Sequence, residues 1–391
     1  GNVIDNADVK YRVVRTATFP YWWYWWRGYY PSSPQMEITN GTTTTDDKGE
    51  FTFSFKAIPD LSVSKKYTPT FTYTVYADVT DINGETRSAT KWVYVGYKSL
   101  NLSVDIPSTV EKSDKGEFNI YTANLNGEKE PAVGTVKIYK LKQPERIFRT
   151  RQWDRPDKYV MTKDEYYAAF PNDLYDDENN MYKWEKGSMV FETFFETPKD
   201  SVIKIKDLDS WKPASYVLEG KTKDKFGEDV EFITYFTVFG KKEKQIPDNS
   251  ISYYSAIVDK CEPGETASFL IGTKDVNTTF LYEVEFDGKI ISKEWIKLSN
   301  EQKLIEIPVK EEHRGNLNVH LFTIKHNRCF TNNLTITVPF TNKELDIEFE
   351  TFRDKLLPGE KEQWKIKIKD KKGDKVAAEM LAAMYDASLD A

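Results

Sequence analysis

A β-hairpin pattern that occurs twice is the feature that most constrains the fold of this chain. In residues 73–96, apolar and polar side chains alternate on both sides of a turn at Asp81 and Gly84. A period of two indicates a strand with one buried face, and glycine allows the positive φ that a tight hairpin turn requires. The same pattern returns in residues 216–240, where Asp224 takes the place of Asp81. Two copies of one hairpin predict an array of similar β domains.

Short strands and turns account for most of the remaining sequence. A Lys-Gly-Glu or Pro-Gly-Glu turn precedes an apolar strand four times, at residues 48–50, 115–117, 263–265 and 358–360. Alternating strands in units of about 100 residues are typical of β-sandwiches with antiparallel sheets. We therefore expect an all-β protein of tandem antiparallel β-sandwiches, fibronectin- or immunoglobulin-like, with a short helical insertion in the second domain.

The spacing of these patterns predicts four domains. Residues 1–96 form the first sandwich, residues 97–240 the second, residues 241–340 the third, and residues 341–391 part of a fourth. The fourth is too short for a complete sandwich. Its strands are therefore expected to be the least stable part of the chain, or to lean on a neighbouring domain or chain. The Ala- and Met-rich end has the composition of a helix.

An insertion at residues 143–200 interrupts the second domain. Within it, Thr162 and Glu165 match a capping box, and Pro171 would end the short helix that follows. The carboxylates of residues 173–178 could bind calcium, which takes oxygen ligands. Their spacing matches no EF-hand, and a solvated acidic loop is the alternative that we favour.

Composition argues against several classes of partner. The net charge of −7 and the pI near 5.4 argue against nucleic acid and against an anionic membrane surface, because both attract basic proteins. No apolar run approaches the ~20 residues of a membrane-spanning helix. No targeting segment is recognisable and Gly1 has the character of a cloning remnant, so we expect a piece of a longer protein.

The few cysteines and histidines offer little chemistry. Cys261 and Cys329 are the only cysteines, and their turns are expected at opposite ends of one sandwich, which favours two free thiols over a bridge. His313, His320 and His326 form no zinc-binding spacing with Cys329. The sequence also lacks a Gly-x-Ser-x-Gly nucleophile elbow. We therefore expect no enzyme, no metal site and no cofactor.

Three further features resemble the bacterial α2-macroglobulin family. They are a strand at residues 9–15 followed by a tryptophan-rich run and by turns at residues 47–51 and 79–87, the Pro-Gly-Glu turns of the later domains, and the closing segment 376–389. The resemblance covers the whole chain and implies tandem macroglobulin-type β-sandwiches. It implies that the first domain is the family's third macroglobulin domain without its first strands. It also implies that residues 376–389 lead toward a bait region.

The resemblance implies a function as well. Members of this family are broad-spectrum protease-trapping inhibitors, exported to the periplasm or cell surface, some of them with a lipid anchor. Cleavage of an exposed bait segment changes their conformation, and in many of them a Cys-x-Glu-Gln thioester captures the protease. Neither Cys261 nor Cys329 matches that motif, so we expect the bait segment and the thioester beyond Ala391. This chain would then be scaffold, with proteases as partners of the full-length protein and neighbouring domains as its own contacts.

The tryptophan-rich run is the candidate binding surface. Trp22, Trp23, Trp25 and Trp26 lie within six consecutive aromatic residues. As a strand, the run would have aromatic side chains on both faces, so a neighbouring domain, a partner or a membrane would have to cover it. Packing against a neighbouring domain is the interpretation that we favour. A cell-surface adhesion or glycan-binding array is the alternative function, because aromatic rings stack on sugars.

Overall fold

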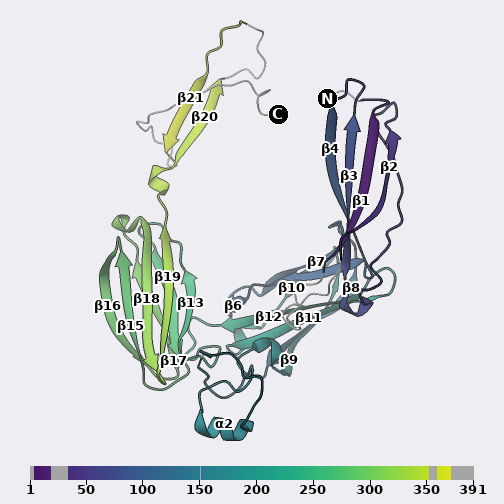
Figure 1. The fold of residues 1–391 in the computed structure, drawn as a ribbon. Coiled ribbons are helices and arrows are strands. Elements are labelled where there is room, and N and C mark those ends of the chain that lie inside the picture. Colours follow the sequence, from purple (N-terminus) through teal and green to yellow (C-terminus); the bar gives the residue numbers. More distant parts are fainter. Residues whose placement is uncertain (1–3, 19–33, 150, 352–358, 371–391) are drawn as a thin grey trace. The chain divides into compact units, whose positions relative to one another are not determined.

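The structure is a computed structural model that describes residues 4–18, 34–149, 151–351 and 359–370. These residues form strands joined by short turns, as Figure 1 shows. Contacts divide the chain into two compact units, which are Gly1–Pro144 with Asp176–Lys242 and Glu145–Tyr175 with Glu243–Ala391. Among the described residues, no helix is long and apolar enough to cross a membrane.

Four antiparallel strands form the first sheet, in the order β2-β1-β3-β4. They are β1 (Asp8–Thr18), β2 (Met36–Thr44), β3 (Thr70–Thr80) and β4 (Thr86–Gly96). β3 and β4 are the predicted hairpin, and Gly84 in their turn has a φ of 84°. The buried core of this sheet consists of Val13, Phe71 and Tyr73. A 3-10 turn, η1 (Lys65–Tyr67), precedes β3.

Residues 51–55 cover one face of this sheet without forming a strand. Phe53 stacks on Tyr11 with ring centroids 4.0 Å apart, and Phe55 lies 5.6 Å from Tyr73. Successive phenylalanine rings of the segment are 6.4 and 6.3 Å apart, as expected for side chains on one side of an extended chain. The alternating sequence predicts a paired strand here, and that prediction is wrong. Its side chains alternate as expected, but none of the described strands pairs with it.

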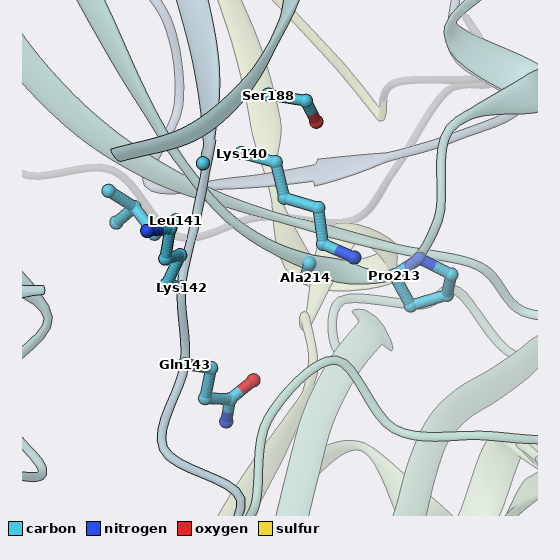
Figure 2. Close-up of a pocket in the computed structure, with 8 residues that line it drawn as sticks. Lys140, Leu141, Lys142, Gln143, Ser188, Pro213 and Ala214 are labelled. Carbon is cyan, nitrogen blue, oxygen red and sulfur yellow. The ribbon is translucent and has the colours of Figure 1, made fainter. Parts of the chain in front are cut away.

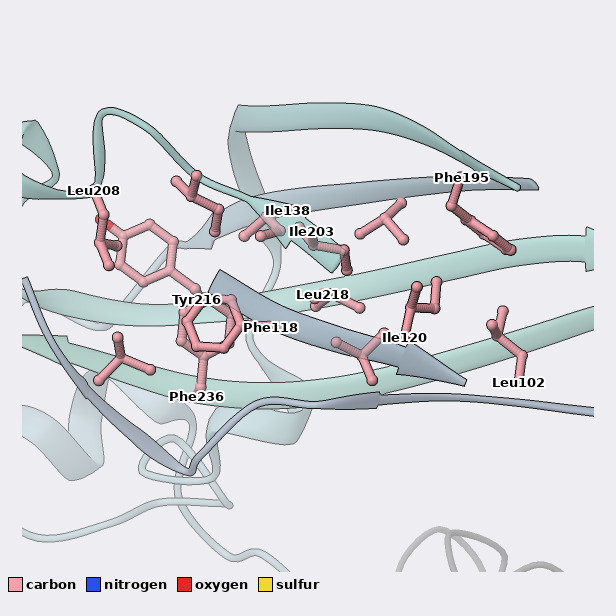
Figure 3. Packing of buried hydrophobic residues seen from close by; sticks show 14 of the residues in the cluster. Leu102, Phe118, Ile120, Ile138, Phe195, Ile203, Leu208, Tyr216, Leu218 and Phe236 are labelled. Atoms are coloured by element: carbon pink, nitrogen blue, oxygen red, sulfur yellow. The ribbon is translucent and has the colours of Figure 1, made fainter. Parts of the chain in front are cut away.

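A complete sandwich follows, with one sheet in the order β10-β7-β5 and one in the order β6-β12-β11-β8-β9. Side chains of both sheets meet in one core, where Figure 3 shows Phe118 of β7 beside Tyr216 and Phe236 of the larger sheet. The strands are β5 (Leu100–Asp105), β6 (Thr109–Glu111), β7 (Glu117–Asn124), β8 (Val133–Leu141), β9 (Lys186–Glu196), β10 (Val202–Lys204), β11 (Ala214–Lys223) and β12 (Asp229–Phe239). A 3-10 turn, η3 (Leu208–Ser210), precedes β11.

The connection from β8 to β9 contains the predicted helix, α2 (Lys163–Ala169). The capping box is confirmed, because the Glu165 amide donates to Thr162 Oγ1 at 3.4 Å and the Glu165 carboxylate accepts from the Thr162 amide at 2.8 Å. The helix ends before Pro171, as predicted. A 3-10 turn, η2 (Met181–Lys183), leads into β9.

A second complete sandwich has sheets in the orders β13-β14-β17 and β16-β15-β18-β19. Its core includes Phe269, Phe280 and Leu317, each almost fully buried. The strands are β13 (Tyr253–Val258), β14 (Thr266–Thr273), β15 (Thr278–Phe286), β16 (Lys289–Leu298), β17 (Glu301–Pro308), β18 (Gly315–Lys325) and β19 (Arg328–Val338). Two 3-10 turns, η4 (Glu311–His313) and η5 (Thr341–Lys343), precede β18 and follow β19.

The two sandwiches share one strand order. In each, the second long strand, β7 or β14, lies in the middle of the three-stranded sheet, and the chain closes on a hairpin of the larger sheet. The all-β class with antiparallel sandwiches is thus confirmed. The short pairing of β6 with β12 is parallel and is the one exception among the described ladders. The four predicted domain boundaries remain predictions.

The last described sheet has two antiparallel strands, β20 (Leu345–Thr351) and β21 (Lys365–Asp370). Ile347 lies opposite Ile368, and Phe349 lies opposite Ile366. The helical end predicted from the Ala- and Met-rich composition lies in residues 371–391, outside the described residues.

Candidate functional site

The predicted aromatic surface lies outside the described structure. Trp22, Trp23, Trp25 and Trp26 belong to residues 19–33, so their packing stays a prediction. The described residues contain three other places with ordered polar chemistry. These are the hairpin turns, the docked segment 145–175, and a cavity in the β5–β12 sandwich.

Asp81 and Asp224 organise the two matching hairpin turns in the same way. Each Oδ1 accepts hydrogen bonds from the amides two and four residues later, at 2.9–3.0 Å. Gly84 and Gly227 follow at φ 84° and 86°, where a residue with a β-carbon is strained. The Glu85 amide is the main cause that holds the pKa of Asp81 below its ordinary value. Both aspartates therefore shape a turn, as the sequence predicts.

Asp224 also holds the start of its own sandwich. Its Oδ2 accepts hydrogen bonds from the Ser99 amide at 2.9 Å and from the Ser99 hydroxyl at 3.2 Å. Burial raises the pKa of the Asp224 carboxyl, but the amides of Ser99 and Glu228 outweigh burial, so this pKa lies below its ordinary value. The turn headed by Asn124 has the same hydrogen bonds and was not predicted, although its Asn-x-x-Gly-Glu spacing is the signal that marks the other turns.

Segment 145–175 docks on the turn between β18 and β19 in the second unit. Arg149 is the central contact, because its guanidinium lies 2.6 Å from the Asp173 carboxylate and donates from Nη1 to the His326 carbonyl at 2.6 Å. The side chains of Arg149 and Asp173 are 15% and 10% exposed. Charge-assisted hydrogen bonds are roughly twice as strong as neutral ones, and poor access to water preserves that advantage. The segment is thus attached through a main-chain oxygen of the turn.

Two further interactions hold the same turn in shape. His326 has a φ of 47°, and its Nε2 lies 2.5 Å from Asp275 Oδ2. The Arg328 guanidinium lies over the Trp153 ring, with Cζ 5.8 Å from the ring centroid. Asp275, which lies just before β15, and Trp153 of the segment therefore contact the same turn whose carbonyl Arg149 binds.

The acidic run at residues 173–178 is not the solvated loop that the sequence predicts. Asp173 is buried against Arg149, and Asp177 forms an ion pair with Lys183. Positively charged side chains of the same chain therefore pair with these two carboxylates. In the part of the chain that the structure describes, no group of three or more His, Cys, Asp or Glu side chains is placed to hold a metal ion.

The two cysteines are free thiols near opposite ends of the β18–β19 ladder. The Cys261 amide donates to the Thr337 carbonyl at 3.0 Å, whereas Cys329 pairs with Ile324 beside the turn at the other end. The preference for unbridged thiols is confirmed. Burial raises the pKa of the Cys261 thiol, and the nearby carboxylates of Glu265 and Asp259 raise it further.

The three histidines are separate rather than clustered with Cys329. His313 is buried, and its Nδ1 accepts a hydrogen bond from the Lys310 amide at 3.1 Å. His320 lies 2.9 Å from Asn333 and 2.8 Å from Glu285, and these two contacts raise its pKa above the ordinary value. Each imidazole therefore has a structural partner of its own.

A cavity of about 430 Å³ opens where β8 ends and β9 and β11 begin (Figure 2). Lys140 follows the buried Val136 and Ile138 on the same side of β8, and Figure 2 shows its side chain extending toward Pro213 and Ala214. An amine, an amide and a hydroxyl can hold a carbonyl or a carboxylate, but they supply no acid–base pair for a reaction. The lining residues are Lys140, Leu141, Lys142, Gln143, Gly187, Ser188, Pro213 and Ala214.

The comparison with known protein families gives a match within the second unit. A family model described as "Alpha-2-macroglobulin bait region domain" matches residues 255–390, which include most of the β13–β19 sandwich and both strands of the last sheet. Residues 255–390 thus match a domain of the alpha-2-macroglobulin family. The resemblance on which the sequence-based expectations rest is thereby confirmed. None of the curated proteins compared matches the sequence.

Solved structures of this family are longer than the chain described here. The trypsin-activated α2-macroglobulin of Escherichia coli is 12% identical over 95% of this chain and 24% of its own, with a TM-score of 0.37. The methylamine-reacted Salmonella α2-macroglobulin is 12% identical over the same two shares, with a TM-score of 0.31. A tetra-tandem repeat of a large adhesion protein is 13% identical over 90% of this chain and 71% of its own, with a TM-score of 0.20. This chain spans about a quarter of the length of the two macroglobulins.

Proposed function

We propose that this chain is a structural scaffold within a broad-spectrum protease-trapping inhibitor, an endopeptidase inhibitor of the alpha-2-macroglobulin family. The observation that carries the proposal is the match of the bait region domain to most of the β13–β19 sandwich and to the strands that follow it. A closed sandwich with one buried core resists proteolysis and suits a supporting role. Proteases are then partners of the longer protein rather than of any pocket in this chain.

The position of the cleaved segment separates two versions of this proposal. The sequence resemblance puts the bait segment beyond Ala391, whereas the matched family is named for the bait region and covers residues 255–390. Limited trypsin digestion of the longer protein, followed by mass spectrometry, locates the first cut. A first cut beyond Ala391 supports the scaffold role. A first cut within residues 255–390 would make this chain the carrier of the bait instead.

The trap itself is tested with the longer protein and an excess of protease. We expect cleavage to change its scattering profile, and the complexed protease to lose activity on a large protein substrate while it keeps activity on a small peptide. An unchanged profile together with unchanged activity on the large substrate would refute the trap. A catalytically inactive protease, which binds without cutting, is the matched control.

We further propose that the longer protein is exported to the periplasm or the cell surface, with a lipid anchor as one means of attachment. An inhibitor of proteases that come from outside the cell would meet them outside the cytoplasm. Fractionation of the native host with an antibody against this chain is the test, and recovery in the cytoplasmic fraction alone would contradict the proposal.

A further inference from the structure

The cavity at the end of β8 belongs to a complete sandwich, and we call it the Lys140 cavity. Its lining residues lie in or next to β8, β9 and β11, and all of them belong to the first compact unit. Its volume of about 430 Å³ lies within the range of roughly 300–1,000 Å³ that is usual for small-molecule sites. The cavity is therefore large enough for a ligand.

The pairing of the strands explains why a cavity opens here. β8 and β11 pair only as far as Lys140 and Tyr216, and Pro213, just before β11, has no amide hydrogen with which to extend the ladder. On its other edge, β8 stays close to β9, where a β-carbon at Gly187 would lie 2.9 Å from the Lys140 carbonyl oxygen. The β8–β9 pairing shifts register on both sides of Tyr139, and such bulges re-aim side chains next to binding sites.

Lys140 occupies a core position of β8. It follows Val136 and Ile138 with a period of two, and both of these side chains are 0% exposed. A lysine at the end of a core covers apolar surface with its stem and holds its ammonium where the core opens, and Figure 2 shows this side chain extending toward Pro213 and Ala214. Among the residues that the structure describes, no carboxylate and no hydrogen-bond acceptor contacts the ammonium.

Two further polar side chains line the same cavity. The Gln143 amide and the Ser188 hydroxyl have no hydrogen-bond partner within the described part of the chain. Lys142, the second lysine of the lining, differs from Lys140 because its ammonium pairs with Glu185 at 3.0 Å. One unpaired cation and two hydrogen-bond donors therefore lie around one space beside an apolar wall.

We propose that the Lys140 cavity binds a ligand that carries one carboxylate on an apolar body of about a dozen heavy atoms. The Lys140 ammonium pairs with the carboxylate, and the Ser188 hydroxyl and the Gln143 amide donate hydrogen bonds to it. The apolar body lies against Pro213 and Ala214. Free organic acids and the C-terminal end of a peptide share this chemistry. The inference concerns binding alone and is independent of the protease-trapping proposal.

Saturation-transfer NMR of the full chain with two acids, N-acetylleucine and 4-phenylbutyrate, tests the proposal. A ligand of this size at ordinary binding efficiency has a Kd on the order of 1 mM, and we expect this affinity. The neutral amides of the two acids have the same shape without the charge and should bind roughly tenfold more weakly. Equal binding of acid and amide would overturn the proposal, as would the absence of saturation transfer to both acids.

The two acids also distinguish the two sources of the carboxylate. N-acetylleucine has the amide group of a peptide terminus, which the Gln143 side chain can bind, whereas 4-phenylbutyrate has none. Tighter binding of N-acetylleucine, lost in Gln143→Ala, supports the C-terminal end of a peptide as the ligand. Equal or tighter binding of 4-phenylbutyrate supports a free organic acid.

Variants of the two lysines locate the site. Lys140→Met removes the ammonium but keeps an apolar stem over the core, so it should weaken the binding of both acids roughly tenfold. Lys142→Met is the matched control and should leave the affinity unchanged, because that ammonium already has Glu185 as its partner. Acid binding that survives Lys140→Met would refute the site, and so would an equal loss in both variants.

A second pair of measurements does not depend on the folding of Lys140→Met. Ser188→Ala changes an exposed side chain and should weaken the binding of both acids about threefold, because one hydrogen bond is lost. In the wild type, the amide resonances of Gly187 and Ala214 should shift as either acid is added. Binding without these shifts would place the acids elsewhere on the chain and would contradict the proposal.

Discussion

The Asp224 carboxylate connects two parts of its domain that are far apart in the sequence. Asp224 accepts four hydrogen bonds, two within its own turn and two from Ser99, 125 positions earlier. Asp81 makes the same turn without the distant partner. Asp81 therefore shapes only its own turn, whereas Asp224 shapes its turn and also holds the start of its sandwich.

Replacement of Asp224 by alanine should cost about 2 kcal/mol of unfolding free energy, because the Ser99 and turn amides lose their acceptor. Since the folded pKa is depressed, this stabilisation is present above the unfolded pKa of about 3.9 and is lost as the pH falls through the folded pKa. Urea unfolding of the wild type and the variant should differ at pH 7 and converge as the pH falls through the folded pKa of Asp224. Asp229→Ala, whose Lys223 partner is at the surface, is the control and should have little effect. A difference that persists at low pH would contradict this role of the ionised carboxylate.

The two thiols should react at very different rates. Cys329 is exposed, whereas Cys261 is 1% exposed and has a raised pKa, so little reactive thiolate is available to reagents. A thiol reagent should label one cysteine of the native chain quickly and the second only after denaturation. Cys329→Ser should abolish the fast phase. Fast labelling of both thiols would show that the β13–β19 core opens readily.

Among the strands, turns and helix, the sequence predicts those features that depend on neighbouring residues. The hairpins, the α2 capping box and the alternating strands follow from turn residues and periodicity within a few positions. The pairing of residues 51–55 was predicted wrongly, because alternation indicates a buried face but a ladder needs a neighbouring strand. The docking of Arg149 on His326 was not predicted either, because no periodic signal links residues 177 positions apart.

Loss of the Arg149 guanidinium should release segment 145–175. Arg149→Met leaves Asp173 charged and largely buried, which should destabilise the second unit by about 3 kcal/mol and accelerate amide exchange in residues 145–175. Asp173→Asn added to this variant should restore part of the stability. Arg155→Met, at an exposed position of the same segment, is the control. Unchanged exchange in Arg149→Met would mean that other contacts hold the segment.

For the whole molecule, the distribution of strands matters more than any pocket. Two complete sandwiches follow one another along the described chain, with the β1–β4 sheet before them and the β20–β21 pair after them. The chain carries a net charge of −7, which opposes association at long range. Added salt screens this repulsion between copies of the chain.

The contact of Arg149 with a main-chain oxygen has a consequence for how this protein can diverge. Any residue that tolerates a φ near 47° presents the same carbonyl at position 326, and asparagine or glycine meets that condition. The turn can therefore drift in sequence while it keeps its partner. Arg149 and Asp173 have no such freedom, because a change in one leaves the charge of the other without its partner. Among homologues, we expect Arg149 and Asp173 to vary together, and position 326 to vary with Asp275, whose carboxylate the His326 side chain contacts.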